Sequence, residues 1–259
     1  MNILVFTKRV AATQEESLRI VGDGKDIDMS KLAFTMNDWD TYAAEAAVKI
    51  VEGTGGLVTA ISMGDAGSDE VLRRAIAMGA NEGFLVEVED ALDDPFARAS
   101  LIHNFLRAEN IAFDAIFTGV QSEDDQFASF GGILAGLFGL PFASMVVGID
   151  NVEHHHMVIR RELEGGVQEK MRIRLPCVLA IQTGANEPRY VSIMSIRKAL
   201  KVERKVYKGS AYRADTKTMI RREKWVYPEK NRGATILAGE LSEVCKKLLE
   251  ILQTKGVHQ

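Results

Sequence analysis

The chain has 259 residues, of which 46% are hydrophobic and 26% charged, so a wholly disordered protein is excluded and one large α/β domain with an appendage, or two small domains, is expected. A net charge of −4 gives no general attraction to nucleic acid or anionic lipid, and no apolar run reaches the roughly 20 residues of a membrane helix. With two distant cysteines and no CxxC pair, we expect no disulfide framework, and a soluble protein of a reducing bacterial cytoplasm or, after loss of a leader, of a matrix-like compartment.

Short apolar runs alternate with helical patterns through the first part of the chain. Strands are predicted at residues 2–7, 57–62, 83–88, 115–120 and 144–149, and helices at residues 41–52, 68–80, 95–109 and 127–139. Near-continuous apolar strands that alternate with helices indicate a mostly parallel sheet covered on both faces. We therefore predict a doubly wound, Rossmann-like α/β domain.

The pattern changes after residue 150. Residues 157–181 alternate apolar and charged side chains around Gly165 and Gly166, which predicts an antiparallel hairpin. Residues 186–232 are basic and show no clear periodicity. An amphipathic helix is then predicted over 239–256, with its apolar stripe formed by Leu241, Val244, Leu248 and Ile251. This helix either closes its own domain or docks on a partner, and the sequence leaves both open.

In an open parallel sheet, ligands bind beyond the carboxyl ends of the strands. The strongest signal there is the string GVQSEDDQFASFGG, which follows the strand at 115–120. Amide groups near Ala128 and Ser129, where a helix begins, suit an anion, and Asp124 and Asp125 suit ribose hydroxyls or a cation. The alternative is an ordinary turn that caps the helix.

Signals of catalysis are missing from the sequence. It contains no GxGxxG, no GxxxxGK and no GxSxG string. The run His154 to His156 falls in a predicted turn, and a solvated turn is favoured over a metal site because consecutive histidines do not all face one ion. The basic stretch from Arg189 to Arg222 is interpreted as a solvated or steering surface rather than a nucleic-acid site. The residues alone therefore indicate a nucleotide-binding module without catalytic machinery.

Longer strings are more specific. In chain order they are ILVFTKRV, MNDWD, AAEAAVKI, VTAISMG, LRRAIAMGA, TGVQSEDDQFASFGGILAG, RRELEGG, LPCVLAIQTGANEPRY and YPEKNRGATILAGELSE. Together they resemble the β (small) subunit of electron transfer flavoproteins over almost the whole length. MNDWD, GVQSEDDQFAS and YPEKNRGAT are most similar to the branch that serves bacterial amine dehydrogenases.

The resemblance implies an electron carrier rather than an enzyme. Its obligate partner would be an α subunit that holds the redox-active FAD, while this chain would hold a structural AMP. Electrons would come from a flavin dehydrogenase and leave to a quinone oxidoreductase. In bifurcating members of the family a second FAD replaces AMP, which gives the first alternative. A nucleotide sensor or enzyme of related fold is the second.

The resemblance also implies which residues bind the nucleotide. They are Phe6, Asn37, Asp38, Trp39, Asp40, Met63, Gly119, Val120, Gln121, Ser122, Asp124, Asp125, Ala128, Ser129 and Phe130. Phe6 replaces a residue that is usually small, and Phe130 replaces a common Thr that donates a hydroxyl to the phosphate. We expect AMP to bind through backbone contacts but more weakly. The rival hypothesis is that the pocket is empty or holds another ligand. A third hypothesis is that both rings belong to the ordinary core and face away from the pocket.

Four further regions are implied to contact partners. Glu162 would contact the flavin domain of the α subunit, and Trp39 would lie towards the flavin ring; a solvated hairpin charge and a core Trp are the alternatives.

The domain prediction is 1–185 for nucleotide binding, 186–203 for partner recognition and 204–259 for an arm that packs on the α subunit. Docking on the donor would use an aliphatic anchor and its neighbours: Ile193, Met194, Arg197 and Lys198.

Overall fold

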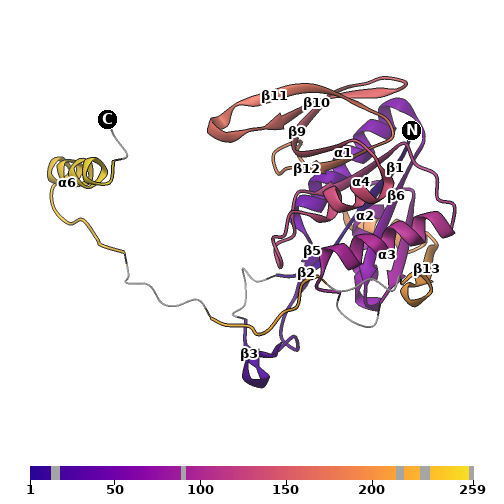
Figure 1. The fold of residues 1–259 in the computed structure, drawn as a ribbon, viewed down its shortest axis with the longest axis horizontal. Helices are drawn as coiled ribbons and strands as arrows, with labels where there is room; N and C mark the ends of the chain where they lie inside the picture. Colours follow the sequence, from indigo (N-terminus) through magenta and orange to yellow (C-terminus); the bar gives the residue numbers. More distant parts are fainter. Residues whose placement is uncertain (13–17, 89–91, 214–218, 228–233, 257–259) are drawn as a thin grey trace.

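The fold is built on a nine-stranded sheet (Figure 1), seen in a computed structural model that describes residues 1–12, 18–88, 92–213, 219–227 and 234–256. The strand order is β11-β10-β9-β12-β8-β1-β6-β7-β13. The strands are β1 (Asn2–Phe6), β6 (Leu57–Gly64), β7 (Glu82–Glu87), β8 (Ala115–Gly119), β9 (Phe142–Val152), β10 (His156–Glu162), β11 (Gln168–Arg174), β12 (Cys177–Ile181) and β13 (Arg204–Lys208). From β9 to β13 every neighbouring pair is parallel, and only β10 and β11 run antiparallel to their neighbours.

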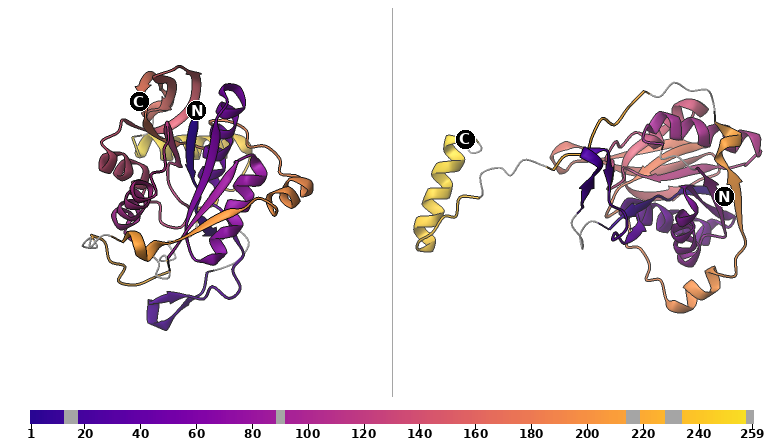
Figure 2. Two further views of the ribbon diagram at one scale, coloured as in Figure 1. Left: turned by 90° about the vertical axis from the view of Figure 1, so that its right-hand side faces the viewer. Right: turned by 90° about the horizontal axis from the view of Figure 1, so that it is seen from below.

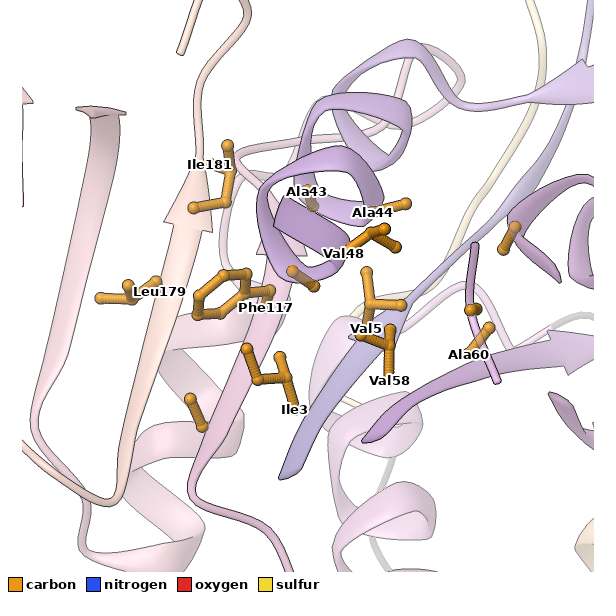
Figure 3. Packing of buried hydrophobic residues seen from close by; sticks show 14 of the residues in the cluster. Ile3, Val5, Ala43, Ala44, Val48, Val58, Ala60, Phe117, Leu179 and Ile181 are labelled. Carbon is orange, nitrogen blue, oxygen red and sulfur yellow. The ribbon is translucent and has the colours of Figure 1, made fainter. Parts of the chain in front are cut away.

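Helices cover both faces of the sheet, which confirms the predicted doubly wound α/β class. The four helices are α1 (Asp38–Thr54), α2 (Asp69–Met78), α3 (Pro95–Ala108) and α4 (Phe130–Phe138). Along β1, Ile3 and Val5 pack with α1 and α2 (Figure 3), while Leu4 and Phe6 pack with α3 and α4 on the other face. This alternation buries both faces of the strand and explains its continuous apolar run.

The predicted hairpin forms, but the boundary at residue 181 is wrong. β10 and β11 pair around Gly165 and Gly166, whose φ angles of 74° and 76° suit glycine. Residues 177–181 instead form β12, a separate strand between β9 and β8 in which every residue is buried. A central parallel strand is apolar on both faces, so its sequence does not alternate as a half-buried hairpin strand does.

Three elements lie among the described residues of the stretch 186–232 that showed no periodicity: α5 (Ile193–Ala199), the 3₁₀ turn Gly209–Tyr212, and β13, which pairs in parallel with β7 at the sheet edge. Two small antiparallel pairs join β2 (Arg9–Ala11) to β5 (Phe34–Met36) and β3 (Ile20–Val21) to β4 (Asp26–Ile27). Single 3₁₀ turns occupy Gly22–Gly24, Ala66–Ser68, Glu164–Gly166 and Gly209–Tyr212.

The predicted C-terminal helix is confirmed as α6 (Leu241–Thr254), and none of its residues is buried. Figures 1 and 2 show it apart from the sheet and its covering helices, so it closes no core of this chain. Part of the YPEKNRGAT string, at 228–233, lies outside the described residues. Within the described part of the chain, no helix is long and apolar enough to cross a membrane.

Candidate functional site

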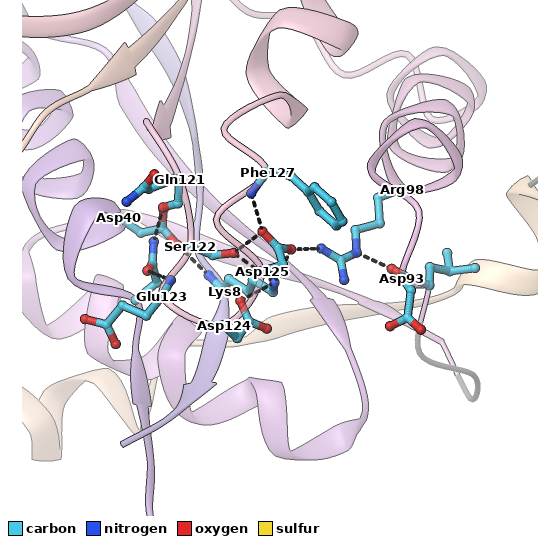
Figure 4. A network of polar contacts seen from close by, with 12 residues as sticks. Lys8, Asp40, Asp93, Arg98, Gln121, Ser122, Glu123, Asp124, Asp125 and Phe127 are labelled. Carbon is cyan, nitrogen blue, oxygen red and sulfur yellow. Dashed lines mark hydrogen bonds and ion pairs between the residues drawn. The ribbon is translucent and has the colours of Figure 1, made fainter. Parts of the chain in front are cut away.

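The carboxyl ends of β1, β6 and β8 meet at one edge of the sheet, where the loop 120–129 follows β8. The Lys8 ammonium, just after β1, lies within this loop (Figure 4). It donates hydrogen bonds to Ser122 Oγ at 3.0 Å, Asp124 Oδ1 at 2.6 Å and Asp125 Oδ2 at 2.8 Å. One lysine therefore joins two segments more than a hundred residues apart in sequence.

Asp125 uses both carboxylate oxygens to hold the loop together. Oδ1 accepts from Ser122 Oγ at 2.8 Å and from the Phe127 amide at 3.1 Å, and Oδ2 also accepts from Arg98 Nη1 of α3 at 2.7 Å. Burial raises the pKa of Asp125, but the hydrogen bonds and charge of Lys8, with the bonds from Phe127 and Arg98, outweigh it, so the pKa lies well below its ordinary value. Asp125 therefore stays ionised and fixes the shape of the loop.

Asp40, in the first turn of α1, bridges two strand ends. Its Oδ2 accepts from the Lys8 amide at 2.8 Å and its Oδ1 from the Gly119 amide at 3.1 Å. Burial raises the pKa of Asp40 to about 7 despite these bonds. A Cβ on Gly119 would lie 2.6 Å from Asp40 Oδ1, so this close approach requires glycine.

Asn37 fixes the other side of the loop. Its Nδ2 donates to the Gln121 carbonyl at 2.9 Å, and its Oδ1 accepts from the Glu123 amide at 3.1 Å. The side chains of Asn37 and Asp40 are thus both buried against the strand ends, while neighbouring Asp38 is exposed. The MNDWD string therefore supports the loop 120–129 through two of its polar residues.

The start of α4 offers hydrogen-bond donors. The helix begins at Phe130 rather than at 127, after Gln126 and Ala128 with φ angles of 52° and 51°, and its N-cap Ser129 makes no side-chain capping bond. Three buried hydroxyls at the strand ends have no hydrogen-bond partner in the structure: Thr7, Ser62 and Thr118. A Cβ on Gly131 would lie 2.8 Å from Thr118 Oγ1, so this hydroxyl adjoins the first turn of α4.

Phe6 and Phe130 face each other at the same edge. Their ring centroids are 5.3 Å apart with an interplanar angle of 70°, an edge-to-face contact. Both rings also pack with the core between the sheet and α3 and α4. The two rings predicted to alter the pocket are therefore in direct contact, and Met63, at the end of β6, packs against the same core.

Of the remaining predicted site residues, Trp39 packs against Gly119 at this edge, whereas those predicted to contact partners through the hairpin and α5 lie elsewhere. Trp39 Nε1 donates to Gln182 Oε1 at 2.8 Å, and Glu162 is exposed at the end of the hairpin. Ile193 and Met194 are exposed in the first turn of α5, and Arg197 and Lys198 lie in its last turn. The described residues contain no group that could hold a metal ion, and His156 instead pairs with Glu153 at 2.8 Å.

Sequence reasoning did not single out Lys8, Arg98, Thr118 or Gln182. For Lys8 and Thr118, the available signal was their place at the carboxyl end of a predicted strand. Arg98 lies inside a helical pattern, and Gln182 in a string noted only for its resemblance. Lys8 and Arg98 both bond Asp125, and Gln182 bonds Trp39, each across more than 25 residues of sequence, so only the folded chain brings these pairs together.

Fold and site together define a doubly wound α/β protein with an internally bonded polar loop at the carboxyl edge of its parallel sheet. A family model described as "Electron transfer flavoprotein domain" matches residues 26–212. The chain is 35% identical to the electron transfer flavoprotein subunit beta of Methylophilus methylotrophus, over 97% of this chain and 98% of that one. Identity to the subunits beta of Bacillus subtilis and Dictyostelium discoideum is 28% and 31%, over 99% and 90% of this chain and 99% and 91% of theirs. The chain therefore belongs to the electron transfer flavoprotein family, among its β subunits.

Proposed function

We propose that this chain is the small subunit of a heterodimeric electron transfer flavoprotein. It receives electrons from a flavin-containing dehydrogenase and passes them to a quinone oxidoreductase, through FAD held mainly by the α subunit. The chain itself acts as a carrier subunit and not as an enzyme. The observation that carries the proposal is the carboxyl edge of the sheet. There, in a chain of this family, the start of α4 and three unpartnered hydroxyls lie at neighbouring strand ends.

The residues at the carboxyl edge fit a nucleotide monophosphate, and we propose AMP as the ligand. The uncapped start of α4 and the unpartnered hydroxyl of Thr118 provide donors for a phosphate. The hydroxyls of Thr7 and Ser62 lie at neighbouring strand ends, where further polar atoms of the ligand would be bound. AMP would have a structural role there.

The contact between Phe6 and Phe130 adds two rings beside the start of α4 and supplies no hydroxyl. Binding would therefore depend on backbone amides, and AMP would be held more weakly than with a Thr at position 130. Asp125 is already saturated by Lys8, Arg98, Ser122 and Phe127. The less constrained Asp124 would then be the carboxylate available to a ribose hydroxyl.

Two residues would contact the flavin domain of the α subunit. The FAD, when bound, supplies the redox chemistry. Trp39, oriented by its hydrogen bond to Gln182, would provide an apolar surface towards the flavin ring. Glu162, exposed at the tip of β10, would pair with a cationic group of the α subunit.

The donor would dock on α5 through Ile193, with Met194 beside it and Arg197 and Lys198 to attract an acidic partner. Ile193 is 69% exposed, as an anchor for a partner pocket must be. We expect Ile193→Ala to slow electron transfer from the donor about tenfold or more, since losing a hot-spot side chain costs at least ~2 kcal/mol. Stopped-flow reduction of the heterodimer measures this, with bound flavin unchanged; an unaltered rate contradicts the assignment.

We further propose that the donor is an amine dehydrogenase, on the strength of the strings MNDWD, GVQSEDDQFAS and YPEKNRGAT. Reduction of the heterodimer by a flavin amine dehydrogenase and by an acyl-CoA dehydrogenase tests this directly. Faster reduction by the acyl-CoA enzyme would contradict it.

The central experiment is to purify the chain with its α subunit, denature the complex and quantify the released FAD and AMP by chromatography. One FAD and one AMP per heterodimer is the expected result. Two FAD and no AMP would contradict the proposal and identify the chain as the small subunit of a bifurcating flavoprotein. One FAD alone would mean that Phe6 and Phe130 exclude the nucleotide. No flavin, with nucleotide turnover by the isolated chain, would favour a nucleotide-dependent enzyme.

A further inference from the structure

Residues 182–189, here called the α1-bound segment, contact one side of α1 along its length. Trp39 Nε1 donates to Gln182 Oε1 at 2.8 Å, and Asn186 Nδ2 donates to the Tyr42 carbonyl at 3.0 Å. Further along the helix, Arg189 pairs with two glutamates of α1. The helix positions involved are 39, 42, 45 and 52, whose spacing places them on one side of α1.

The contact at Arg189 is the strongest of the series. Its Nε and Nη2 donate to the two oxygens of Glu45 at 2.8 and 3.2 Å, and its Nη1 and Nη2 donate to those of Glu52 at 2.7 and 3.0 Å. The Arg189 amide also donates to Glu45 Oε2 at 3.1 Å. Glu45 is 1% exposed, so its carboxylate depends on its cationic partners, which are Arg189 and, at 3.6 Å, the Lys49 ammonium. Planar guanidinium geometry makes both pairings bidentate, which an ammonium group does not reproduce.

An exposed apolar surface begins at the next residue. It consists of Tyr190, Ile193, Met194 and Ile196, here called the α5 surface, and Tyr190 is 89% exposed. After it, Ala199 is buried in the core and Arg204 pairs with Asp69 of α2. The α5 surface is therefore held at both ends, by Arg189 on α1 and by Ala199 and Arg204 on α2.

We propose that Arg189 is a positioning residue that pre-orders the α5 surface for its partner. The α1-bound segment contacts α1 from position 39 to position 52, a length of about 20 Å at 1.5 Å per residue. It therefore also fixes the α5 surface relative to Trp39. A surface ordered before binding loses less conformational entropy when the partner docks. The proposal deepens the proposed function, since it rests on docking of the donor at α5.

The test uses two variants that leave Glu45 with a cationic partner in different ways. Glu52→Ala removes the outer bidentate pair at a side chain that is 57% exposed, so no buried charge is left alone. Arg189→Lys keeps the charge but loses the planar fork. The control is Glu153→Ala, which removes an exposed carboxylate that contacts the half-buried His156 on the β9–β10 turn, away from α1 and α5.

Two measurements are made on the heterodimer. Hydrogen–deuterium exchange follows the amides of residues 186–200, with those of β1 and β6 as the internal reference. Steady-state kinetics with flavin dehydrogenases for amines and for acyl-CoA as donors gives the KM for the heterodimer and kcat. Expected for Glu52→Ala and Arg189→Lys are exchange about tenfold faster in 186–200 only, and a KM raised about fivefold to tenfold at unchanged kcat. The control variant should match the wild type in both.

Unchanged exchange and unchanged KM in Glu52→Ala would overturn the proposal, even if Arg189→Lys fails to fold. Faster exchange throughout β1 and β6 would also overturn it, because the pair would then stabilise the whole fold rather than this segment. If no donor reduces the wild-type heterodimer, the proposed function fails. The exchange measurement then still decides whether Arg189 orders residues 186–200.

Discussion

Asp40 is a buried carboxyl group whose two oxygens accept backbone hydrogen bonds from the ends of β1 and β8. Burial raises its pKa from 3.8 to about 7. Between about pH 4 and 7, the folded chain therefore holds a proton that the unfolded chain has released. The stability contribution of this group is fully present below pH 4 and is lost as the pH rises to about 7.

We expect the wild type to lose stability relative to Asp40→Asn by about 1.4 kcal/mol per pH unit over that range, and no more above it. The comparison cancels the titration of all other groups. Urea denaturation of the two heterodimers from about pH 5 to about pH 8 measures the difference. A difference independent of pH would mean that Asp40 keeps an ordinary pKa.

Phe130 stands at the first turn of α4 in contact with Phe6. We expect Phe130→Thr to raise the AMP retained after dialysis, because it removes a ring beside the helix start and adds a hydroxyl donor. A threefold to tenfold gain corresponds to about 0.5–1.5 kcal/mol, the net value of one hydrogen bond.

The control for this change is Phe113→Thr. Phe113 packs on the same core as Phe130 and contacts Phe138 at a centroid distance of 5.6 Å. This variant should lose stability without retaining more nucleotide. Equal retention in wild type and Phe130→Thr would show that the ring at position 130 does not limit binding.

For single residues, the sequence predicts which residue types stand at the site better than it predicts which residues they contact. Asp124 and Asp125 were expected to face a ligand, since their string follows a strand. In the structure Asp125 binds Lys8 and Arg98, which lie 117 and 27 residues away in sequence. A local pattern contains no information on which distant cation will arrive, so the internal use of Asp125 was not predictable.

Elements were predictable where burial leaves a simple periodicity. The central strands β1, β6, β7 and β8 are apolar on both faces, and each was expected within a few residues of its position. β12 was merged with the hairpin because an apolar run does not reveal its neighbours in the sheet. β13 was missed because its sequence, RKVYK, has three basic residues and no alternation of apolar and polar side chains, and none of its residues is buried at the sheet edge.

α4 contains three glycines, of which Gly131 and Gly136 differ most in their surroundings. A Cβ on Gly131 would lie 2.8 Å from Thr118 Oγ1, whereas one on Gly136 would meet nothing within 4 Å. We expect Gly131→Ala to destabilise the chain by about 1–3 kcal/mol, because α4 must move away from β8. Gly136→Ala should stabilise it by about 0.5–1 kcal/mol through helix propensity.

Urea denaturation of both heterodimers measures the two changes, and Gly136→Ala is the matched control in the same helix. Gly131→Ala should also reduce bound AMP, since Thr118 and the start of α4 would shift relative to each other. Equal stability of the two variants would contradict the close packing of α4 on β8.

The whole molecule separates into surfaces with different tasks. The carboxyl edge of the sheet is polar and internally bonded, the α5 surface is held at both ends, and α6 lies apart with its apolar side chains in solvent. Leu241, Leu248 and Ile251 are all exposed on the predicted stripe. Such a stripe is stable only when another surface covers it. Among the partners proposed for this chain, the α subunit is the permanent one.

We therefore expect Leu248→Ser to weaken the heterodimer. Full burial of a leucine contributes about 1.5–3 kcal/mol, so the dissociation constant should rise about 10-fold to 150-fold. Glu250→Ser is the control, because it changes the opposite side of the same helix. Analytical ultracentrifugation of the purified heterodimers measures the dissociation. Because α6 buries none of its residues within this chain, the melting temperature of the β chain alone should be the same in both variants. A lower melting temperature in Leu248→Ser would show that the helix packs on its own chain, and equal dissociation of the two variants would show that the stripe is not the contact.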